Sequence, residues 1–213
     1  MFYETRSGHP LPHDPFKAII APRPIGWIST VDAGGRHNLA PYSFFAALAS
    51  QPPIVGFSSE GMKDSPANAR ETGEFVFNLV SESLLHAMNA SAANVPRGID
   101  EFALAGLAMA PCRLVRPGRV AGSPAALECK VLQVFELHDL DGKPTDRHVV
   151  LGQVVGVHID ERYLTGGRFD TAAARPVARC GYRDYATVSE VFELLRPDDP
   201  VPAESGQRVP AAR

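Results

Sequence analysis

The stretch GWISTVDAGGRHNLAPYSFF, residues 26–45, decides the fold that this sequence predicts. Its first residues, together with the preceding Ile25, form a largely apolar run over Ile25–Val31 that predicts a strand. Residues 38–45 predict a second strand. The turn between them contains Gly34 and Gly35, and glycine readily adopts the positive φ angles that a tight hairpin turn requires. We therefore expect two antiparallel strands joined by a short turn.

The polar residues of this hairpin stand next to large rings. Ser29 and Thr30 close the first strand, and Ser43 lies directly before Phe44 and Phe45. Neighbouring rings are usually part of a core, but a partly apolar platform with a few polar groups is also what a planar ligand needs. Both interpretations are open from the pattern alone.

The remainder of the chain predicts mostly strands joined by hairpins. The longest pair covers Ala126–His138 and His148–Ile159, and Asp141 with Gly142 between them is typical of a hairpin turn. Because strands follow one another and helices are few, the pattern favours one mainly β domain, an antiparallel barrel with helical excursions, over a fold of alternating strands and helices. The shorter expected elements are a strand or turn at 16–20, a helical turn at 46–48, strands at 54–58 and 74–80, and a helix at 81–91.

The clearest helix start in the sequence is the segment from Lys63 to Pro66. Asp64 or Ser65 can cap the helix, and Pro66 suits its first position. The free N–H groups and partial positive charge of a helix N-terminus favour an anion, and the Lys63 ammonium and Ser65 hydroxyl would add to this preference. Asn68 can reach back from the first turn. The alternative is an ordinary capped helix with a solvated lysine.

Composition argues against several classes of protein. The net charge of -3 and the pI of about 6.2 give no electrostatic footprint for nucleic acid or a membrane surface. No apolar run approaches the ~20 residues of a membrane helix, and the N-terminal residues lack the apolar segment of a signal peptide. Cys112, Cys129 and Cys180 are far apart, so we predict reduced thiols in a cytoplasmic protein.

No sequence motif identifies a metal site or a catalytic acid–base pair. The seven histidines are scattered, and His148 and His158 lie too far apart on one expected strand to share a metal ion. Glycine-rich phosphate loops, the HExxH motif of zinc proteases and the GxSxG motif of hydrolases are absent from the sequence. We therefore predict no metal ligand and no catalytic side chain.

Several short blocks of the sequence resemble the flavin reductase-like, FMN-binding split-barrel family, and its flavoredoxin-like branch is the most similar. The blocks stand in the family's order between residues 16 and 196, which we expect to form the domain. They are RPIGWIST (23–30), NLAPYSFF (38–45), PP (52–53), KDS (63–65) with Asn68, TGEFVFN (72–78), MN (88–89), DEF (100–102), GL (106–107) and LEC (127–129).

The resemblance implies a six-stranded antiparallel split β-barrel with Greek-key features and a few peripheral helices. Residues 1–15 would then be an N-terminal extension, and residues 197–213 a disordered tail. The resemblance also implies a homodimer, with FMN bound in a groove near the dimer interface.

The resemblance assigns the residues of the FMN site in groups. The ribityl and phosphate side would be lined by Trp27, Ile28, Ser29 and Thr30, and the flavin ring would be bordered by Ser43, Phe44 and Phe45. The phosphate end would be held by Ser58, Lys63, Asp64 and Ser65 with support from Asn68, and Tyr182 would approach the flavin of the partner subunit.

For function, the resemblance implies an FMN-dependent NAD(P)H:flavin oxidoreductase. Hydride would pass from NAD(P)H to FMN and then to a flavin, a small acceptor or a partner monooxygenase, and the cofactors themselves carry that chemistry. One alternative is an FMN-carrying electron-transfer protein that NAD(P)H does not reduce directly. Another is a pyridoxamine-phosphate-oxidase-like or haem-handling relative that shares only the barrel.

Overall fold

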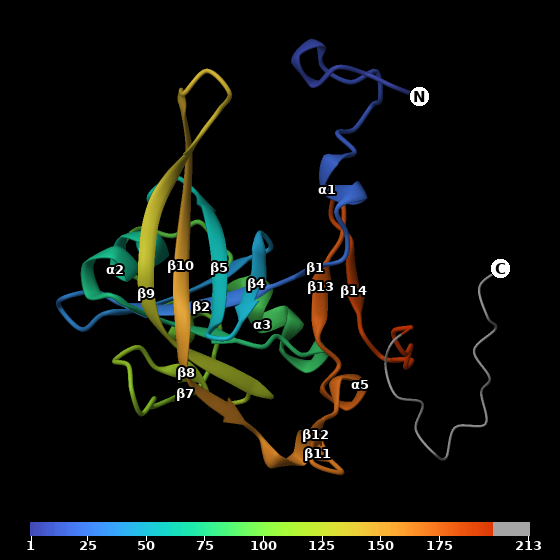
Figure 1. Ribbon diagram of the computed structural model, residues 1–213. Coiled ribbons are helices and arrows are strands. Elements are labelled where there is room, and N and C mark those ends of the chain that lie inside the picture. The colour runs from blue at the N-terminus through green and yellow to red at the C-terminus, as the bar shows by residue number, and fades with distance from the viewer. Residues whose placement is uncertain (198–213) are drawn as a thin grey trace.

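A curved antiparallel sheet of seven strands is the main feature of the computed structural model, which describes residues 1–197 (Figure 1). The strand order is β3-β2-β6-β9-β10-β5-β4, and every neighbouring pair is antiparallel. The strands are β2 (Gly26–Val31), β3 (His37–Tyr42), β4 (Phe45–Ser50), β5 (Pro53–Glu60), β6 (Glu74–Asn78), β9 (Ala125–His138) and β10 (Pro144–Ile159). This mainly β architecture confirms the predicted fold class.

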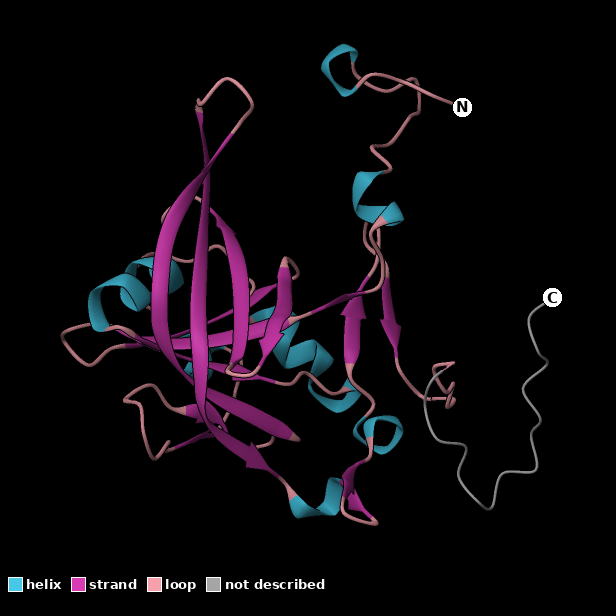
Figure 2. Ribbon diagram, in the orientation of Figure 1, coloured by secondary structure: helices cyan, strands magenta, loops and turns pink. Residues whose placement is uncertain are grey.

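The helices are short and lie around the sheet (Figure 2). Among residues 1–197 no helix is both long and apolar enough to cross a membrane. The α-helices are α1 (Phe16–Ile19), α2 (Asp64–Thr72), α3 (Leu85–Ala90), α4 (Glu101–Leu104) and α5 (Thr171–Ala174), and the 3-10 helices are η1 (Thr5–Ser7), η2 (Glu82–Leu84) and η3 (Glu161–Tyr163).

A small sheet of order β1-β13-β14 stands beside the large sheet, and the N-terminal residues continue away from it (Figure 1). It joins the two ends of the domain, because β1 comes directly before β2 whereas β13 and β14 follow β10 by many residues. The strands of this small sheet are β1 (Arg23–Pro24), β13 (Val177–Arg179) and β14 (Tyr185–Thr187). Two further sheets have two strands each: β7 (Met109–Ala110) pairs with β8 (Arg119–Val120), and β11 (Leu164–Thr165) pairs with β12 (Arg168–Phe169).

Two of the three apolar clusters in the described core lie on opposite faces of β2, and the third gathers Val76, Val115 and Ala126. Side chains alternate along β2, so that Ile28 joins Phe57 and Phe75 in a cluster enclosed by β2, β5, β6, β9 and β10. Trp27 points to the other face, where it packs with Met88 of α3 and Phe102 of α4. Burial on both faces explains why β2 reads as a nearly continuous apolar run.

The chain passes from one edge of the large sheet to the other at Ser43 and Phe44. The second strand of the opening hairpin was predicted to run through Phe45, but β3 ends at Tyr42 and the chain bends before β4. The predicted helical turn at 46–48 is wrong, because β4 pairs along β5 and this tertiary pairing overrides the helical preference of its alanines. The segment adds a strand, which is why the large sheet has seven strands where six were predicted.

Local chain chemistry explains two other differences. Residues 16–19 form α1, not the predicted strand or turn, because the Asp14 carboxylate accepts the Phe16 N–H at 2.9 Å and Pro15 suits a helix start. Helix α2 was predicted to be capped by Asp64 or Ser65, yet Lys63 occupies the N-cap position and its side chain makes no capping hydrogen bond.

The β9–β10 hairpin is confirmed and is longer than predicted, because β10 already begins at Pro144. The helix predicted at 81–91 is present as η2 followed by α3. The tail predicted to be disordered lies outside the described residues, apart from Pro197.

Candidate functional site

A polar pocket of about 580 Å³ lies between β3, the start of α2 and the loop after α3. Its volume falls within the range of ~300–1,000 Å³ that is typical of sites for small molecules and cofactors. The residues that line this polar pocket are Asn38, Ala40, Pro41, Tyr42, Glu60, Lys63, Asp64, Ser65, Ser91, Ala92, Ala93, Asn94, Val95, Arg97 and Glu101.

A buried hydrogen-bond network forms the wall of the polar pocket. Asn38 Nδ2 donates to Ser65 Oγ at 2.8 Å and to Thr30 Oγ1 at 3.3 Å, and Asn68 Nδ2 donates to Thr30 Oγ1 at 3.1 Å. The four residues are almost fully buried. Asn68 Oδ1 is also buried and has no hydrogen-bond partner in the described chain, which is unusual for a polar atom shielded from solvent.

The start of α2 offers positive charge and free donors to the polar pocket. Lys63 precedes the helix, and the first N–H groups of a helix have no partner within it. The nearby carboxylate of Asp64 is partly neutralised, because Arg97 Nε lies 3.4 Å from Asp64 Oδ1. An anion at this end of the pocket would therefore meet an ammonium group, a hydroxyl group and helix N–H donors.

The pKa values of two titratable side chains that line the polar pocket are raised above their ordinary values. Burial raises the pKa of Tyr42, although hydrogen bonds with Ser65 and Ser59 partly oppose this. Burial also raises the pKa of Glu101, against the opposing effect of the Leu39 N–H, which donates to its carboxylate at 3.0 Å.

A cationic pocket of about 240 Å³ adjoins the polar pocket, and both are lined by Pro41 and Ala92. The two pockets therefore form one groove along β3. Lys17, Arg23 and Arg179 line the cationic pocket, while no carboxylate is found among its described lining residues. The other residues that line it are Ile25, Ser43, Met88, Cys180, Tyr182 and Tyr185.

Arg23 is buried in the wall of the cationic pocket, and within residues 1–197 it has no carboxylate partner. Its Nη1 donates to the carbonyl oxygens of Lys17 and Ile20, and its Nη2 donates to the Cys180 carbonyl at 2.8 Å. Its Nε is buried and has no hydrogen-bond partner among the described residues. The guanidinium charge is thus left uncompensated beside the pocket, and this favours a ligand that carries negative charge at this end.

The structure brings five of the residues predicted for the site to the groove. Lys63, Asp64 and Ser65 line the polar pocket, and Ser43 and Tyr182 line the cationic pocket. Tyr182 was predicted to approach the flavin of a partner subunit, and here it stands with Ser43 of its own chain.

Thr30 and Asn68 lie behind the groove, within the buried network beneath Ser65. They do not face the open part of the polar pocket, so their role is to hold Asn38 and Ser65 in place. Thr30 was predicted to line the ribityl and phosphate side and lies one layer further back, whereas Asn68 was predicted to support the residues of the phosphate end and lies in the network beneath Ser65.

The other predicted residues do not line the polar or the cationic pocket, apart from those named above. Trp27, Ile28 and Ser29 are fully buried. Trp27 lies directly beneath the groove, because its Nε1 donates to the Oγ of the pocket residue Ser91 at 2.9 Å, whereas Ser29 donates to the Gly118 carbonyl at 2.6 Å. The ring of Phe45 stacks on Phe77 with 4.7 Å between centroids.

Phe44, Phe45 and Ser58 line an apolar pocket of about 340 Å³ beside β4 and β5, which adjoins the cationic pocket because Arg23 and Ser43 line both. Ser58 therefore does not stand with Lys63, although the resemblance placed both at the phosphate end. The sequence could not separate them, because their positions depend on which edge of the sheet each strand occupies.

Several groove residues escaped the sequence-based assignment. Asn38 and Glu101 stand in blocks that carried the resemblance, but no role was assigned to them. Arg23 likewise opens the block RPIGWIST without an assigned role, and Arg97 gave no local signal, since an isolated arginine is most often a solvated surface residue. Only the folded chain shows that these residues border one groove.

The family model for the flavin reductase like domain matches residues 20–172 of the chain. The chain belongs to the flavin reductase-like family. An uncharacterized relative from Deinococcus radiodurans is 40% identical over 192 residues, which cover 84% of this chain and 82% of the relative.

Solved structures of flavin reductase-like proteins share the fold. Nitrilotriacetate monooxygenase component B from Bacillus cereus has a TM-score of 0.82 and 30% identity, over 91% of this chain and 98% of that chain. Flavoredoxin of Desulfovibrio vulgaris has a TM-score of 0.74 and 21% identity, over 92% and 99% of the two chains. A flavin reductase with a split barrel domain from Shewanella frigidimarina has a TM-score of 0.77 and 22% identity, over 91% of this chain and 94% of that chain, and this likeness confirms the split-barrel fold.

FMN fits the groove by the chemistry of its two ends. FMN carries a phosphate at one end of a flexible polyol and a flat ring with polar edges at the other. The polar pocket supplies Lys63, Ser65 and the start of α2 for a phosphate, and the cationic pocket supplies Ser43 and three cationic side chains for a ring with acceptor atoms.

Proposed function

We propose that this protein binds FMN in the groove along β3 and acts as an NAD(P)H:flavin oxidoreductase. The observation that carries the proposal is the pairing of an anion-binding helix start at Lys63–Ser65 with a cation-lined pocket at Ser43, joined through shared lining residues. The family match supports a flavin as the bound molecule.

The proposal gives each end of the groove a separate task. Lys63, the Ser65 hydroxyl and the first N–H groups of α2 hold the phosphate, and Asn38 keeps Ser65 oriented from behind. Ser43 and the cationic pocket face the flavin ring. Trp27, Ile28 and Ser29 support the groove from the core, and Phe44, Phe45 and Ser58 line the apolar pocket that adjoins its cationic end.

When bound, FMN would accept hydride from NAD(P)H, which is chemistry that the cofactor itself supplies. The chain's own contribution is to bind and orient. Arg23, Lys17 and Arg179 favour negative charge at the ring end, because no carboxylate among the described lining residues offsets them. The proposal therefore needs no catalytic acid or base.

The monooxygenase component among the structural neighbours supports delivery of electrons to a partner enzyme. A monooxygenase or another electron acceptor is accordingly the partner that we propose, and neither nucleic acid nor a membrane is part of the proposal. The three free cysteines suit a cytoplasmic protein, as predicted.

We also propose a homodimer that forms through β4 and the apolar pocket beside it. Strand β4 is an edge of the large sheet, and Leu48 is 56% exposed while Phe44 is 45% exposed. An apolar exposed edge strand is normally covered by a partner.

Sedimentation of the wild-type protein at micromolar concentration is expected to give a dimer, and Leu48→Asp a monomer. The matched control is Leu140→Asp, at the exposed tip of the β9–β10 hairpin, which should leave the dimer intact. A monomeric wild-type protein would contradict the proposed dimer.

The catalytic proposal is tested by mixing the FMN-loaded protein with NADH or NADPH without oxygen and following the flavin absorbance. Rapid bleaching is the expected result. Bound FMN that bleaches slowly or not at all would reject the reductase in favour of an electron-transfer flavoprotein. Failure to bind FMN at all would reject both.

A further inference from the structure

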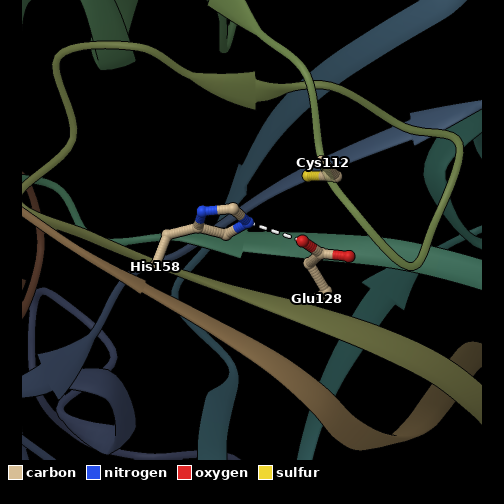
Figure 3. A group of neighbouring side chains, drawn as sticks. All are labelled: Cys112, Glu128 and His158. Atoms are coloured by element: carbon tan, nitrogen blue, oxygen red, sulfur yellow. Dashed lines mark hydrogen bonds and ion pairs between the residues drawn. The ribbon is translucent and has the colours of Figure 1, made fainter.

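Cys112, Glu128 and His158 point toward one another at a place outside the groove along β3, here called the flavin groove because FMN is proposed to bind there (Figure 3). They come from the loop between β7 and β8, from β9 and from β10. The cysteine Sγ, a carboxylate oxygen and a histidine ring nitrogen all lie within 4.8 Å of one another. These are the three side-chain types that zinc most often binds in proteins.

A pocket of about 390 Å³, here called the Glu128 pocket, opens beside this group. Its lining residues are Arg113, Leu114, Glu128, Gly156, Val157, His158 and Ile159, and none of them lines the flavin groove. Within the group the Glu128 side chain is 1% exposed and that of His158 is 19% exposed. The group is therefore buried at Glu128 and reachable from solvent at His158.

Backbone donors fix the Glu128 carboxylate in position. Its Oε2 accepts the N–H groups of Leu114 at 2.6 Å and Val115 at 3.1 Å, and its Oε1 accepts the Arg113 N–H at 2.8 Å. The remaining position on Oε1 faces His158 Nε2 at 2.5 Å. Supporting hydrogen bonds of this kind orient the carboxylates that bind metals, and here they leave one coordination position, on the side of the histidine.

A nucleophilic cysteine is the competing interpretation of the same three residues, and the geometry disfavours it, because the histidine is not directed at the sulfur as a general base would be. His158 directs Nε2 to the carboxylate and not to the sulfur (Figure 3).

We propose that Cys112, Glu128 and His158 bind one Zn²⁺ ion, whose fourth coordination position faces the Glu128 pocket. One thiolate and one carboxylate balance the two charges of the ion, and the neutral imidazole completes the set. The thiol proton and the proton between His158 and Glu128 leave to solvent. Nε2 and Oε1 must move apart from 2.5 Å to roughly 3.3 Å, the separation of two tetrahedral zinc ligands, and the partly exposed histidine is the residue that moves.

The test is a titration of Co²⁺ into tag-free, metal-free, full-length protein. Cobalt is the probe because a thiolate ligand gives it a charge-transfer band in the near ultraviolet. The expected result is one Co²⁺ per chain with this band, which Zn²⁺ then removes by displacement. Wild-type protein without the band would overturn the proposal.

Cysteine variants locate the ligand. Cys112→Ser should abolish the band, whereas Cys180→Ser, the matched control in the cationic pocket, should keep it. A band that survives in Cys112→Ser, or that disappears in Cys180→Ser, would place the metal elsewhere and overturn the assignment.

A histidine variant guards against misfolding of the cysteine variant. His158→Gln should keep its circular dichroism spectrum and lose at least ~10-fold in Co²⁺ affinity. Its control is His148→Gln, which disrupts the only other described group of potential ligands, formed with Glu136 and Asp146. That control should retain both the band and the affinity. Equal affinities in both histidine variants would contradict the proposal.

Discussion

The polar pocket and the Glu128 pocket use the same sheet in opposite ways. The wall of the polar pocket is a buried network of amides and hydroxyls from Thr30, Asn38 and Ser65, and Lys63 supplies positive charge at the edge. In the other pocket the buried group is the carboxylate of Glu128, held by three backbone N–H groups. The first arrangement leaves donors for an anion, and the second leaves an acceptor for a cation.

The two pockets also shift carboxyl groups in opposite directions. Burial raises the pKa of Glu101 in the polar pocket. Burial likewise opposes ionisation of Glu128, but the Arg113 N–H and His158 outweigh it and lower the pKa of that group. The direction of the pKa shift of a buried carboxyl group therefore depends on its hydrogen-bond donors as well as on its burial.

The largest expected effect comes from Glu128→Ala, which leaves three backbone N–H groups of residues 113–115 without their acceptor. We expect a loss of about 3–5 kcal/mol in the free energy of unfolding, measured with urea. The matched control is Glu82→Ala, which removes a half-exposed ion pair with Arg175 and should change stability little. Equal effects from both variants would show that the Glu128 carboxylate does not hold the loop.

Ser65→Ala should weaken FMN binding by about 10–100-fold, because a hydroxyl donor to a charged phosphate is worth ~1.5–3 kcal/mol. Ser58→Ala is the matched control, since the structure places Ser58 with Phe44 in the apolar pocket. A flavin fluorescence titration measures both affinities. A stronger effect from Ser58→Ala would favour the arrangement implied by the resemblance over the groove described above.

The smallest effect is a pH dependence at Glu74, on the same face of β6 and β9 as Glu128. Burial opposes its ionisation, but hydrogen bonds from Lys130 and the Arg116 N–H outweigh this and lower its pKa below the ordinary 4.5. Its contribution is therefore present above pH 4.5 and is lost as the pH falls through the lowered value.

Glu74→Gln should cost about 1 kcal/mol at pH 7, because its cationic partners are about half exposed to solvent. The difference from wild type should vanish in acid. Urea unfolding at several pH values measures it, and a difference that grows toward low pH would have the wrong sign.

The sequence predicted the barrel because its signals were local or carried by motifs. The pattern of apolar residues by itself predicts the long β9–β10 hairpin and the buried strand β2. The bend at Ser43 and Phe44, between β3 and β4, could not be predicted from the sequence. It follows from the pairing of β4 with β5, which is a contact between separate segments. The alanines of β4 carry a helical preference that only tertiary structure overrides.

The site was predicted in part for the same reason. The segment Lys63–Ser65 predicted an anion site from the chemistry of a helix N-terminus alone. Arg23, in contrast, joins the groove only in the folded chain, where the pairing of β1 with β13 brings the Cys180 carbonyl to its guanidinium group. The Cys112, Glu128 and His158 group was missed because its members lie on three segments with no metal-ligand spacing. Distant residues of common types become informative only when the fold brings them together.

The most direct test of the groove compares the affinities of FMN and riboflavin, which differ only in the phosphate. Wild-type protein should prefer FMN by at least ~100-fold, because Lys63 and Ser65 each contribute ~1.5–3 kcal/mol to phosphate binding. The double variant Lys63→Ala with Ser65→Ala should bind riboflavin as the wild type does and should lose this preference. A double variant that still prefers FMN by the wild-type ratio would contradict the placement of the phosphate at the start of α2.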